Sequence, residues 1–375
     1  MTEQAIAIAD EIVVKLFGAM EERGLDALLA TSPENVAWAS GAAPPSQKTV
    51  RSRLAAALVP RDGESELVAI ALEGPVVRTQ SRLGSLRLYE EFVEDPVLVF
   101  ADSLLQRGLG EGIIGVEETH LSHADFGKLA SALPRAQLVR ADELFEELRM
   151  VKTPAEIVAI RDIGVAAERI AAEVCATFRA GATERGIANF VAERYAEAGG
   201  DGLTMLVVGS GPRSAAVNAP ATSRELENGD ILRLDIIGTK AHYHSDVART
   251  MVVGDPTAEQ QEVYDLLLGV HRRCLAALRP GALTTDIFAI YQDAMDAANL
   301  PSYHFVGHGL GVTLHEDPFV NALKPIALAP GMVLCIEPLT LLEGRFGVQI
   351  EDEVLITADG YELITEAGDL MRMGG

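Results

Sequence analysis

The stretch that decides the fold of the second half of the chain runs from Asp230 to Thr250 and reads DILRLDIIGTKAHYHSDVART. One apolar run reaches Asp235, a polar, turn-like segment follows, and Asp246 lies in a second run. This separation predicts two antiparallel strands joined by a hairpin, with both carboxylates at one place. A carboxylate that ends an apolar strand is costly to bury without a partner, so the pair indicates a site. Two ordinary strand-end aspartates are the alternative.

Three later segments carry more side chains of the same kind. HFVGHGLG at 304–311 and LHE at 314–316 contain His304, His308 and His315, and the glycines around His308 permit close backbone approach. VLCIEP at 333–338 and GVQIEDE at 347–353 each place a glutamate, Glu337 or Glu351, after an apolar run. Taken singly, the histidine segment has a flexible loop with incidental histidines as its alternative. Each glutamate has a solvated strand-end residue as its alternative.

Taken together, four carboxylates and one imidazole form a coherent set of metal ligands. They are Asp235, Asp246, His308, Glu337 and Glu351. A carboxylate-rich set suits Mn²⁺, and an imidazole extends the choice to Zn²⁺, Co²⁺ or Fe²⁺. Two such ions about 3.5–4 Å apart can activate a water molecule and polarise a carbonyl group. The chemistry expected is hydrolysis.

Composition limits the class of partner. The chain has 375 residues with 31 Lys and Arg against 55 Asp and Glu, a net charge of −24. Nucleic acids and anionic membranes need a basic surface, so neither is expected as a partner. A composition of 48% hydrophobic and 23% charged residues is typical of a folded chain, which at this length has two or three domains.

The location is predicted from two absences in the sequence. No apolar run reaches the roughly 18 residues of a membrane-spanning helix, and no basic segment precedes the short apolar stretch near the N-terminus. The three cysteines, Cys175, Cys274 and Cys335, are far apart and odd in number. Reduced thiols in a cytoplasmic protein are therefore expected.

Residues 1–150 alternate short apolar runs with amphipathic segments, which predicts an α/β domain. The expected strands are Asp26–Thr31, Leu54–Val59, Leu67–Ala71, Ile113–Val116 and Gln137–Val139. The expected helices are Ala5–Arg23, Phe100–Arg107 and His123–Leu133. A boundary near Arg149–Lys152 separates this domain from residues 151–375.

Residues 151–375 are predicted to be α+β. Helices are expected from Thr153 and from Thr257, each with a capping-box residue three positions later (Glu156 and Gln260). The other expected elements are helices Thr183–Glu197 and Asp286–Ala298 and strands Leu203–Val208, Asp230–Ile237, Met332–Ile336, Val354–Thr357 and Tyr361–Ile364.

On these residues the sequence resembles the pita-bread metallopeptidases, in the branch of Xaa-Pro aminopeptidase and prolidase. LDALL at 25–29 and NVAWASG at 35–41 resemble the creatinase-like N-terminal domain of that family, and VKTPAEI at 151–157 resembles its domain junction. The five ligand segments stand in the family's order. The resemblance implies a creatinase-like α/β domain over 1–150 and a pita-bread catalytic domain over 151–375.

The resemblance also implies roles for single residues. Asp246 and Glu351 would bind two divalent ions, Asp235 one of them, and His308 and Glu337 the other. Glu337 would also act as general base and then acid, while His315 and His304 would stabilise the substrate carbonyl. The resemblance further implies that manganese is the preferred metal, that the substrate is a small peptide or amide, and that the protein forms a homodimer.

The chain departs from the family at two positions expected to contact substrate. Asn218 stands where the family usually has a histidine, and Gln349 stands where it usually has an arginine. Two neutral amides should hold a dipeptide carboxylate weakly. Tyr243 is the third substrate-contact candidate; its neighbours His242 and His244 are expected to be exposed in the hairpin turn. His271 is expected at the surface.

Three functions remain open on the sequence alone. The first is a dimetal peptidase that cleaves an Xaa-Pro or related amide bond near a peptide N-terminus. The second is hydrolysis of a small non-peptide C–N bond, as in creatinase and ectoine-hydrolase relatives. The third is a binding protein without catalysis, which the five intact ligands disfavour.

Overall fold

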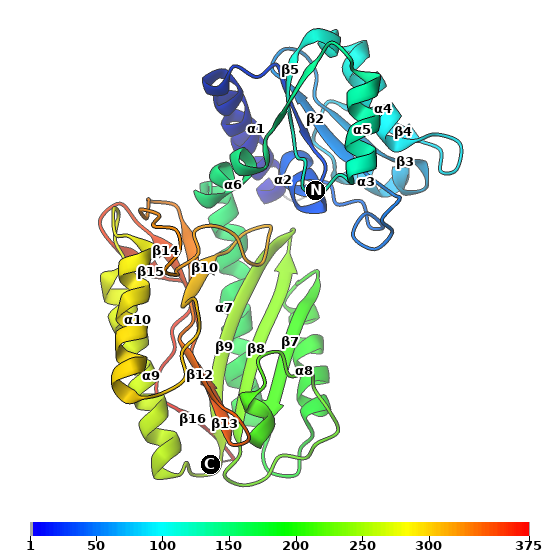
Figure 1. Ribbon diagram of the computed structural model, residues 1–375. Coiled ribbons are helices and arrows are strands. Elements are labelled where there is room, and N and C mark those ends of the chain that lie inside the picture. Colours follow the sequence, from blue (N-terminus) through cyan, green and yellow to red (C-terminus); the bar gives the residue numbers. More distant parts are fainter. Residues whose placement is uncertain (1–2, 375) are drawn as a thin grey trace. The chain divides into compact units, whose positions relative to one another are not determined.

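The computed structural model describes residues 3–374, which divide into two compact units, one ending at Arg149 and the other beginning at Met150 (Figure 1). Unit 1 is an α/β layer structure built on one mixed sheet of six strands. In sheet order the strands are β4 (Ser85–Tyr89), β3 (Glu66–Ile70), β2 (Ala56–Pro60), β1 (Ala27–Ala30), β5 (Ile113–Val116) and β6 (Gln137–Arg140). β1 is antiparallel to β2 and parallel to β5.

Helices surround the sheet of unit 1. They are α1 (Glu3–Arg23), α2 (Pro33–Ser40), α3 (Gly74–Gln80), α4 (Pro96–Gln106), α5 (His123–Ala132) and α6 (Asp142–Met150), with 3₁₀ turns η1 (Ala71–Glu73) and η2 (Leu109–Glu111). The sequence did not predict α2, α3, α6 or β4. The three helices have nine residues or fewer, too few to show a helical period, and β4 is a half-exposed edge strand.

Unit 2 contains four long helices. They are α7 (Pro154–Thr177), α8 (Glu184–Glu197), α9 (Ala258–Ala277) and α10 (Thr284–Ala298). Both predicted capping boxes are confirmed: Thr153 with Glu156 begins α7, and Thr257 with Gln260 begins α9. None of the helices in residues 3–374 combines the length and apolarity needed to cross a membrane.

Two four-stranded sheets and a separate hairpin complete unit 2. One sheet has the order β16 (Met371–Met373), β9 (Tyr243–Val253), β8 (Ile231–Lys240), β7 (Gly202–Ser210). The other has the order β10 (Gly307–Gly309), β11 (Val333–Ile336), β14 (Asp352–Ile356), β15 (Tyr361–Leu363). The hairpin pairs β12 (Leu339–Leu342) with β13 (Phe346–Gln349), and a 3₁₀ turn η3 (Gly211–Ala215) follows β7. β10, β12, β13 and β16 were not predicted, although β11 and β15, which are equally short, were.

The two sheets are covered by different helix pairs. Apolar residues of α7 and α8 pack on β7, β8 and β9, whereas those of α9 and α10 pack on β11, β13 and β14 (Figure 1). The turns before α8 and α10 make equivalent backbone hydrogen bonds. The Gly181 N–H, before α8, donates to the Leu226 carbonyl, and the Gly281 N–H, before α10, donates to the Leu328 carbonyl. The expected fold class, α/β followed by α+β, is confirmed.

Candidate metal centre

Asp235 and Asp246 lie on neighbouring strands of one hairpin. β8 and β9 are antiparallel, with Asp235 opposite Ala248 and Asp246 opposite Ile237. Opposed residues of antiparallel strands point to the same face, and so does every second residue along a strand. The two carboxyl groups therefore share a face of the sheet.

The histidine and the two glutamates come from the region of the second sheet. His308 is the middle residue of β10, Glu337 follows β11, and Glu351 lies between β13 and β14. The His308 Nε2 atom is 3.2 Å from Oε1 of Glu337. It is also 3.8 Å from one carboxylate oxygen each of Asp246 and Glu351. The five expected ligands thus converge on one place.

The glycines beside His308 are required by close packing. A Cβ atom at Gly307 would lie 2.3 Å from the carbonyl oxygen of Cys335, and one at Gly309 would lie 2.5 Å from that of Asp317. Neither position has room for a side chain. The glycines therefore let the backbone around His308 approach its neighbours, which fixes where the imidazole can point.

Each of the five side chains has one buried polar atom without a hydrogen-bond partner within residues 3–374. These atoms are Asp235 Oδ1, Asp246 Oδ1, His308 Nε2, Glu337 Oε1 and Glu351 Oε1. Buried polar atoms nearly always have partners, and a buried carboxylate without one is especially costly. The donor set fits divalent cations, which in proteins prefer carboxylate oxygens and imidazole nitrogens.

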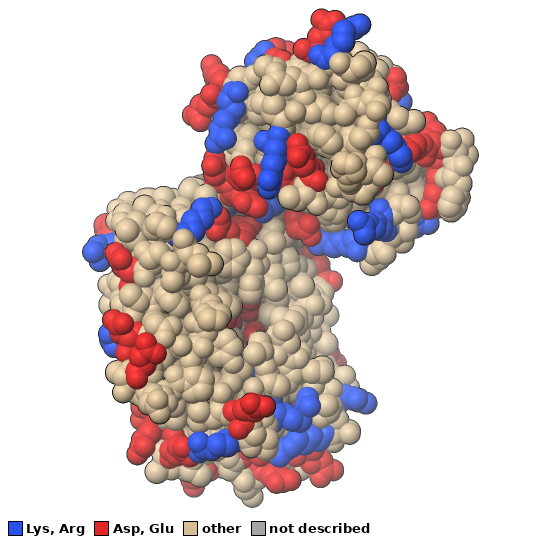
Figure 2. Space-filling model, viewed as in Figure 1, with Lys and Arg blue, Asp and Glu red and all other residues tan. Residues whose placement is uncertain are grey.

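The electrostatics of the centre also favour positive charge. Burial, followed by the charges of Glu351 and Asp235, raises the pKa of Asp246 well above its ordinary value. Burial and the charge of Glu337 likewise raise the pKa of Glu351. Cations between these groups would restore their ionised forms, because an opposite charge favours ionisation. Figure 2 shows a hollow in the surface of unit 2 with acidic atoms at its floor.

Residues next to the ligands hold the strands that carry them. Arg249 donates to the carbonyl oxygen of Glu351 at 2.5 Å. The Thr250 hydroxyl donates to the carbonyl of Gln349 at 2.8 Å and accepts from its N–H at 2.9 Å. Glu353 accepts the backbone N–H of Asp246 at 2.9 Å. These bonds tie β9 to the segment that contains Glu351.

The two candidate catalytic histidines differ in their surroundings. The His315 ring stacks on that of His308, and His308, His315 and Glu337 can bring one ligand atom each within 4.8 Å of the others. Partial burial, and then the neighbouring His308 and His244, lower the pKa of His315 to about 4. His304 is exposed and precedes β10, outside that group.

The three candidate substrate contacts are also spread out. Asn218 is exposed in the loop after η3. Gln349 is buried, with its amide nitrogen 3.2 Å from Oδ2 of Asp235. Tyr243 is buried, and its hydroxyl donates to Oε1 of Glu156 at 3.1 Å. Gln349 thus lies beside three of the candidate ligand carboxylates, those of Asp235, Glu337 and Glu351.

Sequence reasoning missed or misplaced three residues. His244 was expected in an exposed turn, but it is buried and its ring lies 3.3 Å from the Gly311 carbonyl, because β9 extends to Tyr243. His271 was expected at the surface, but it is buried on α9, 3.4 Å from Asp352. Arg233 was not singled out, although a charged residue inside an apolar strand two positions before Asp235 is the signal that could have found it.

Comparison with known proteins assigns both units. Residues 158–358 match the model of metallopeptidase family M24, and residues 13–151 match that of the creatinase/prolidase N-terminal domain. The probable dipeptidase PepE of Mycobacterium tuberculosis is 32% identical over 350 residues, 91% of this chain and 90% of that protein. The Xaa-Pro dipeptidase of Pyrococcus furiosus is 28% identical over 95% of this chain and 98% of its own length.

Solved structures of a dipeptidase and a prolidase have the same fold as this chain. The crystal structure of dipeptidase PepE from Mycobacterium ulcerans superposes with a TM-score of 0.84 at 29% identity, covering 99% of both chains. The prolidase from Pyrococcus horikoshii superposes with a TM-score of 0.83 at 25% identity, covering 96% of this chain and 99% of its own. The chain therefore belongs to metallopeptidase family M24 and carries a creatinase/prolidase N-terminal domain ahead of the M24 domain.

Proposed function

We propose that this hydrolase cleaves an Xaa-Pro or related amide bond near the N-terminus of a small peptide. The observation that carries the proposal is the set of five buried candidate ligand side chains, each with one polar atom that has no hydrogen-bond partner in residues 3–374; of these atoms, His308 Nε2 and Glu337 Oε1 lie 3.2 Å apart. The choice of substrate is supported by relatives named as a dipeptidase and an Xaa-Pro dipeptidase.

Two divalent cations are proposed to bind in the centre, with manganese first and cobalt, zinc or iron as alternatives. Asp246 and Glu351 would contact both ions, Asp235 one, and His308 with Glu337 the other. When bound, such a pair polarises the scissile carbonyl and lowers the pKa of a water molecule.

The protein's own groups would then move protons and bind the carbonyl oxygen. Glu337 accepts a proton from the attacking water and returns it to the leaving nitrogen. His315, neutral at pH 7 because its pKa is about 4, donates an N–H to the carbonyl oxygen as charge develops there. His304 is proposed as a second donor and Asn218 as a contact to the substrate.

We further propose a cytoplasmic homodimer that binds neither nucleic acid nor membranes. The dimer rests on the family resemblance, and the location is supported by three free thiols. The net charge of −24 opposes binding to phosphate backbones. In the face drawn in Figure 2, acidic and basic side chains are interspersed. Light scattering after gel filtration tests the dimer.

The substrate proposal is tested with a panel of metal-loaded assays. The panel pairs each Xaa-Pro peptide with its Xaa-Ala counterpart and adds small cyclic amidines. Hydrolysis confined to or strongly favouring the Xaa-Pro member is expected. Turnover of the amidines alone would favour a non-peptide C–N hydrolase, and binding without turnover of any compound would favour a binding protein.

A further inference from the structure

We propose that Arg233 and Gln349 form a positioning pair, which turns the metal-ligand carboxylates toward the cations and ties them to the loop that carries Asn218. This inference rests on the proposed metal centre. It concerns two residues that do not themselves act as ligands: Arg233 on β8, and Gln349 at the end of β13.

Gln349 occupies one oxygen of each of three ligand carboxylates. Its Nε2 atom is 3.2 Å from Oδ2 of Asp235, 3.3 Å from Oε2 of Glu351 and 3.5 Å from Oε2 of Glu337. The other oxygen of each of these groups is the buried atom without a hydrogen-bond partner. The two hydrogens of the amide are shared among these three acceptors, so the amide faces one oxygen of each carboxylate and leaves the other for a cation.

Arg233 determines which way the Gln349 amide points. Its Nη1 atom donates to Oε1 of Gln349 at 2.7 Å. A guanidinium has only donors, so the amide oxygen must face it, and the amide NH₂ must then face the carboxylates. The reversed amide would place donors against donors at one end and acceptors against acceptors at the other. Arg233 thus acts on the carboxylates through Gln349.

The same guanidinium holds the loop after η3. Arg233 Nε donates to the carbonyl of Ser214 at 3.0 Å, and Nη2 donates to the carbonyls of Ala216 and Val217. Asn218 is the next residue of this loop. Arg233 is buried, and its guanidinium donates both to these carbonyls and to Gln349. A single side chain therefore holds both the loop and the Gln349 amide in place.

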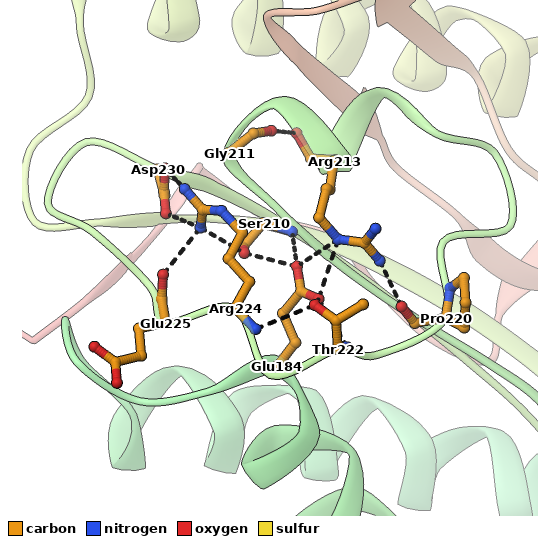
Figure 3. Close-up of polar contacts among 10 residues, drawn as sticks. Glu184, Ser210, Gly211, Arg213, Pro220, Thr222, Arg224, Glu225 and Asp230 are labelled. Atoms are coloured by element: carbon orange, nitrogen blue, oxygen red, sulfur yellow. Dashed lines mark hydrogen bonds and ion pairs between the residues drawn. The ribbon is translucent and has the colours of Figure 1, made fainter.

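Figure 3 shows that Glu184 and Arg213 form a second set of hydrogen bonds to the ends of this loop, separate from those of Arg233. Buried Glu184 accepts from the Ser210 N–H at 2.9 Å and from the Thr222 N–H at 2.9 Å. Arg213 lies 3.2 Å from both Glu184 oxygens and donates to the Pro220 carbonyl at 2.6 Å. Arg213 therefore offers a matched control, an arginine that holds the same loop without an interaction with Gln349.

The test uses charge-preserving variants of the full chain and titrates Mn²⁺ into metal-free protein by calorimetry. Gln349→Met removes the amide and should weaken Mn²⁺ binding by about 10–100-fold, the range usual for groups that hold metal ligands. Arg233→Lys cannot serve Gln349 and three carbonyls together, so it should also weaken binding. In the Gln349→Met background Arg233→Lys should have no further effect on binding, and Arg213→Lys should leave Mn²⁺ affinity unchanged in either background.

Steady-state assays on the same proteins distinguish an effect on the loop from an effect on metal binding. Arg213→Lys and Arg233→Lys should both raise KM, but only Arg233→Lys should do so together with weaker metal binding. Unchanged Mn²⁺ affinity in Gln349→Met, or an equal effect of Arg233→Lys in both backgrounds, would overturn the inference. Wild-type protein that binds none of Mn²⁺, Co²⁺, Zn²⁺ and Fe²⁺ would overturn the proposed metal centre and this inference with it. Because Gln349→Met alone can overturn the inference, it does not depend on the folding of Arg233→Lys.

Discussion

The imidazole rings of His308 and His315 are stacked, with centroids 3.8 Å apart and planes at 25°. His308 has an unpartnered Nε2 atom that faces the carboxylates. His308 is buried, whereas His315 is exposed. The His315 ring therefore lies beside the proposed ligand on the exposed side of the centre. The stack therefore places the proposed metal ligand, His308, directly beside the proposed substrate contact, His315.

His315→Ala should retain two metal ions per chain and lose about 10²–10³ in kcat, the usual cost of one donor to a developing oxyanion. Metal analysis and steady-state kinetics on the same preparation check both parts. His123→Ala, on exposed α5 of unit 1, is the control and should match the wild type. A near-normal kcat for His315→Ala would remove this residue from the catalytic set.

Glu184→Gln should destabilise unit 2 by about 1.5–3 kcal/mol at pH 7, the range for hydrogen bonds to a charged group. Burial acts to raise the pKa of Glu184, but its hydrogen bonds from Thr222 and Ser210 prevail and lower it. A lowered pKa contributes stability above the unfolded value of about 4.3, and that stability is lost as the pH falls through the folded value.

The difference in unfolding free energy between wild type and Glu184→Gln should thus shrink between pH 7 and acid pH below about 4. Denaturant titrations at both pH values measure it. Glu259→Gln, whose carboxylate is in an exposed pair with Arg345, should show little difference at either pH. A gap that stays constant with pH would mean that the charge of Glu184 contributes nothing.

Much of the fold could be predicted because its signals are local. Thr153 and Thr257 are followed by capping-box partners, and the Asp235–Asp246 spacing predicts a hairpin; all three features are present. The strand β10 reads GHG and has no apolar pattern by which it could be recognised, whereas the equally short β15 follows the Asp359–Gly360 turn signal and was predicted. β10 forms because its neighbour β11 supplies its hydrogen bonds.

Side-chain environments were harder to predict than elements. The sequence identifies Gln349 as an unusual residue but not its neighbours, because Arg233 is more than a hundred positions away and meets it only in the folded chain. His271 lies on the apolar stripe of α9, four positions after Leu267 and four before Leu275, so helical periodicity could have placed it in the interior, but its partner Asp352 is distant in the sequence.

Substrates with a free carboxylate next to the scissile bond should gain little from it. Gln349 is committed to Arg233 and the ligand carboxylates, and Asn218 is neutral. Neutral donors hold a carboxylate less strongly than an arginine does. The ratio of kcat/KM for an Xaa-Pro dipeptide and its C-terminal amide should therefore be close to one.

The double variant Asn218→His with Gln349→Arg should move that ratio toward the free dipeptide. Thermal melting and the metal content of the double variant are the controls, because Gln349→Arg also removes the oxygen that accepts from Arg233 and the amide beside the candidate ligand carboxylates. If the wild type already prefers the free dipeptide by tenfold or more, then another cation binds the carboxylate, and this interpretation of the two substitutions is wrong.

The central claim is that the five converging side chains form a two-metal hydrolytic centre. The most direct measurement is metal content together with turnover of an Xaa-Pro peptide, before and after exhaustive chelation, for the wild type and Asp246→Ala. The account predicts about two Mn²⁺ per chain, loss of turnover on chelation, recovery on adding Mn²⁺ to the wild type, and no recovery in Asp246→Ala, since that ligand serves both ions. Full turnover by protein shown to be free of metal would contradict it.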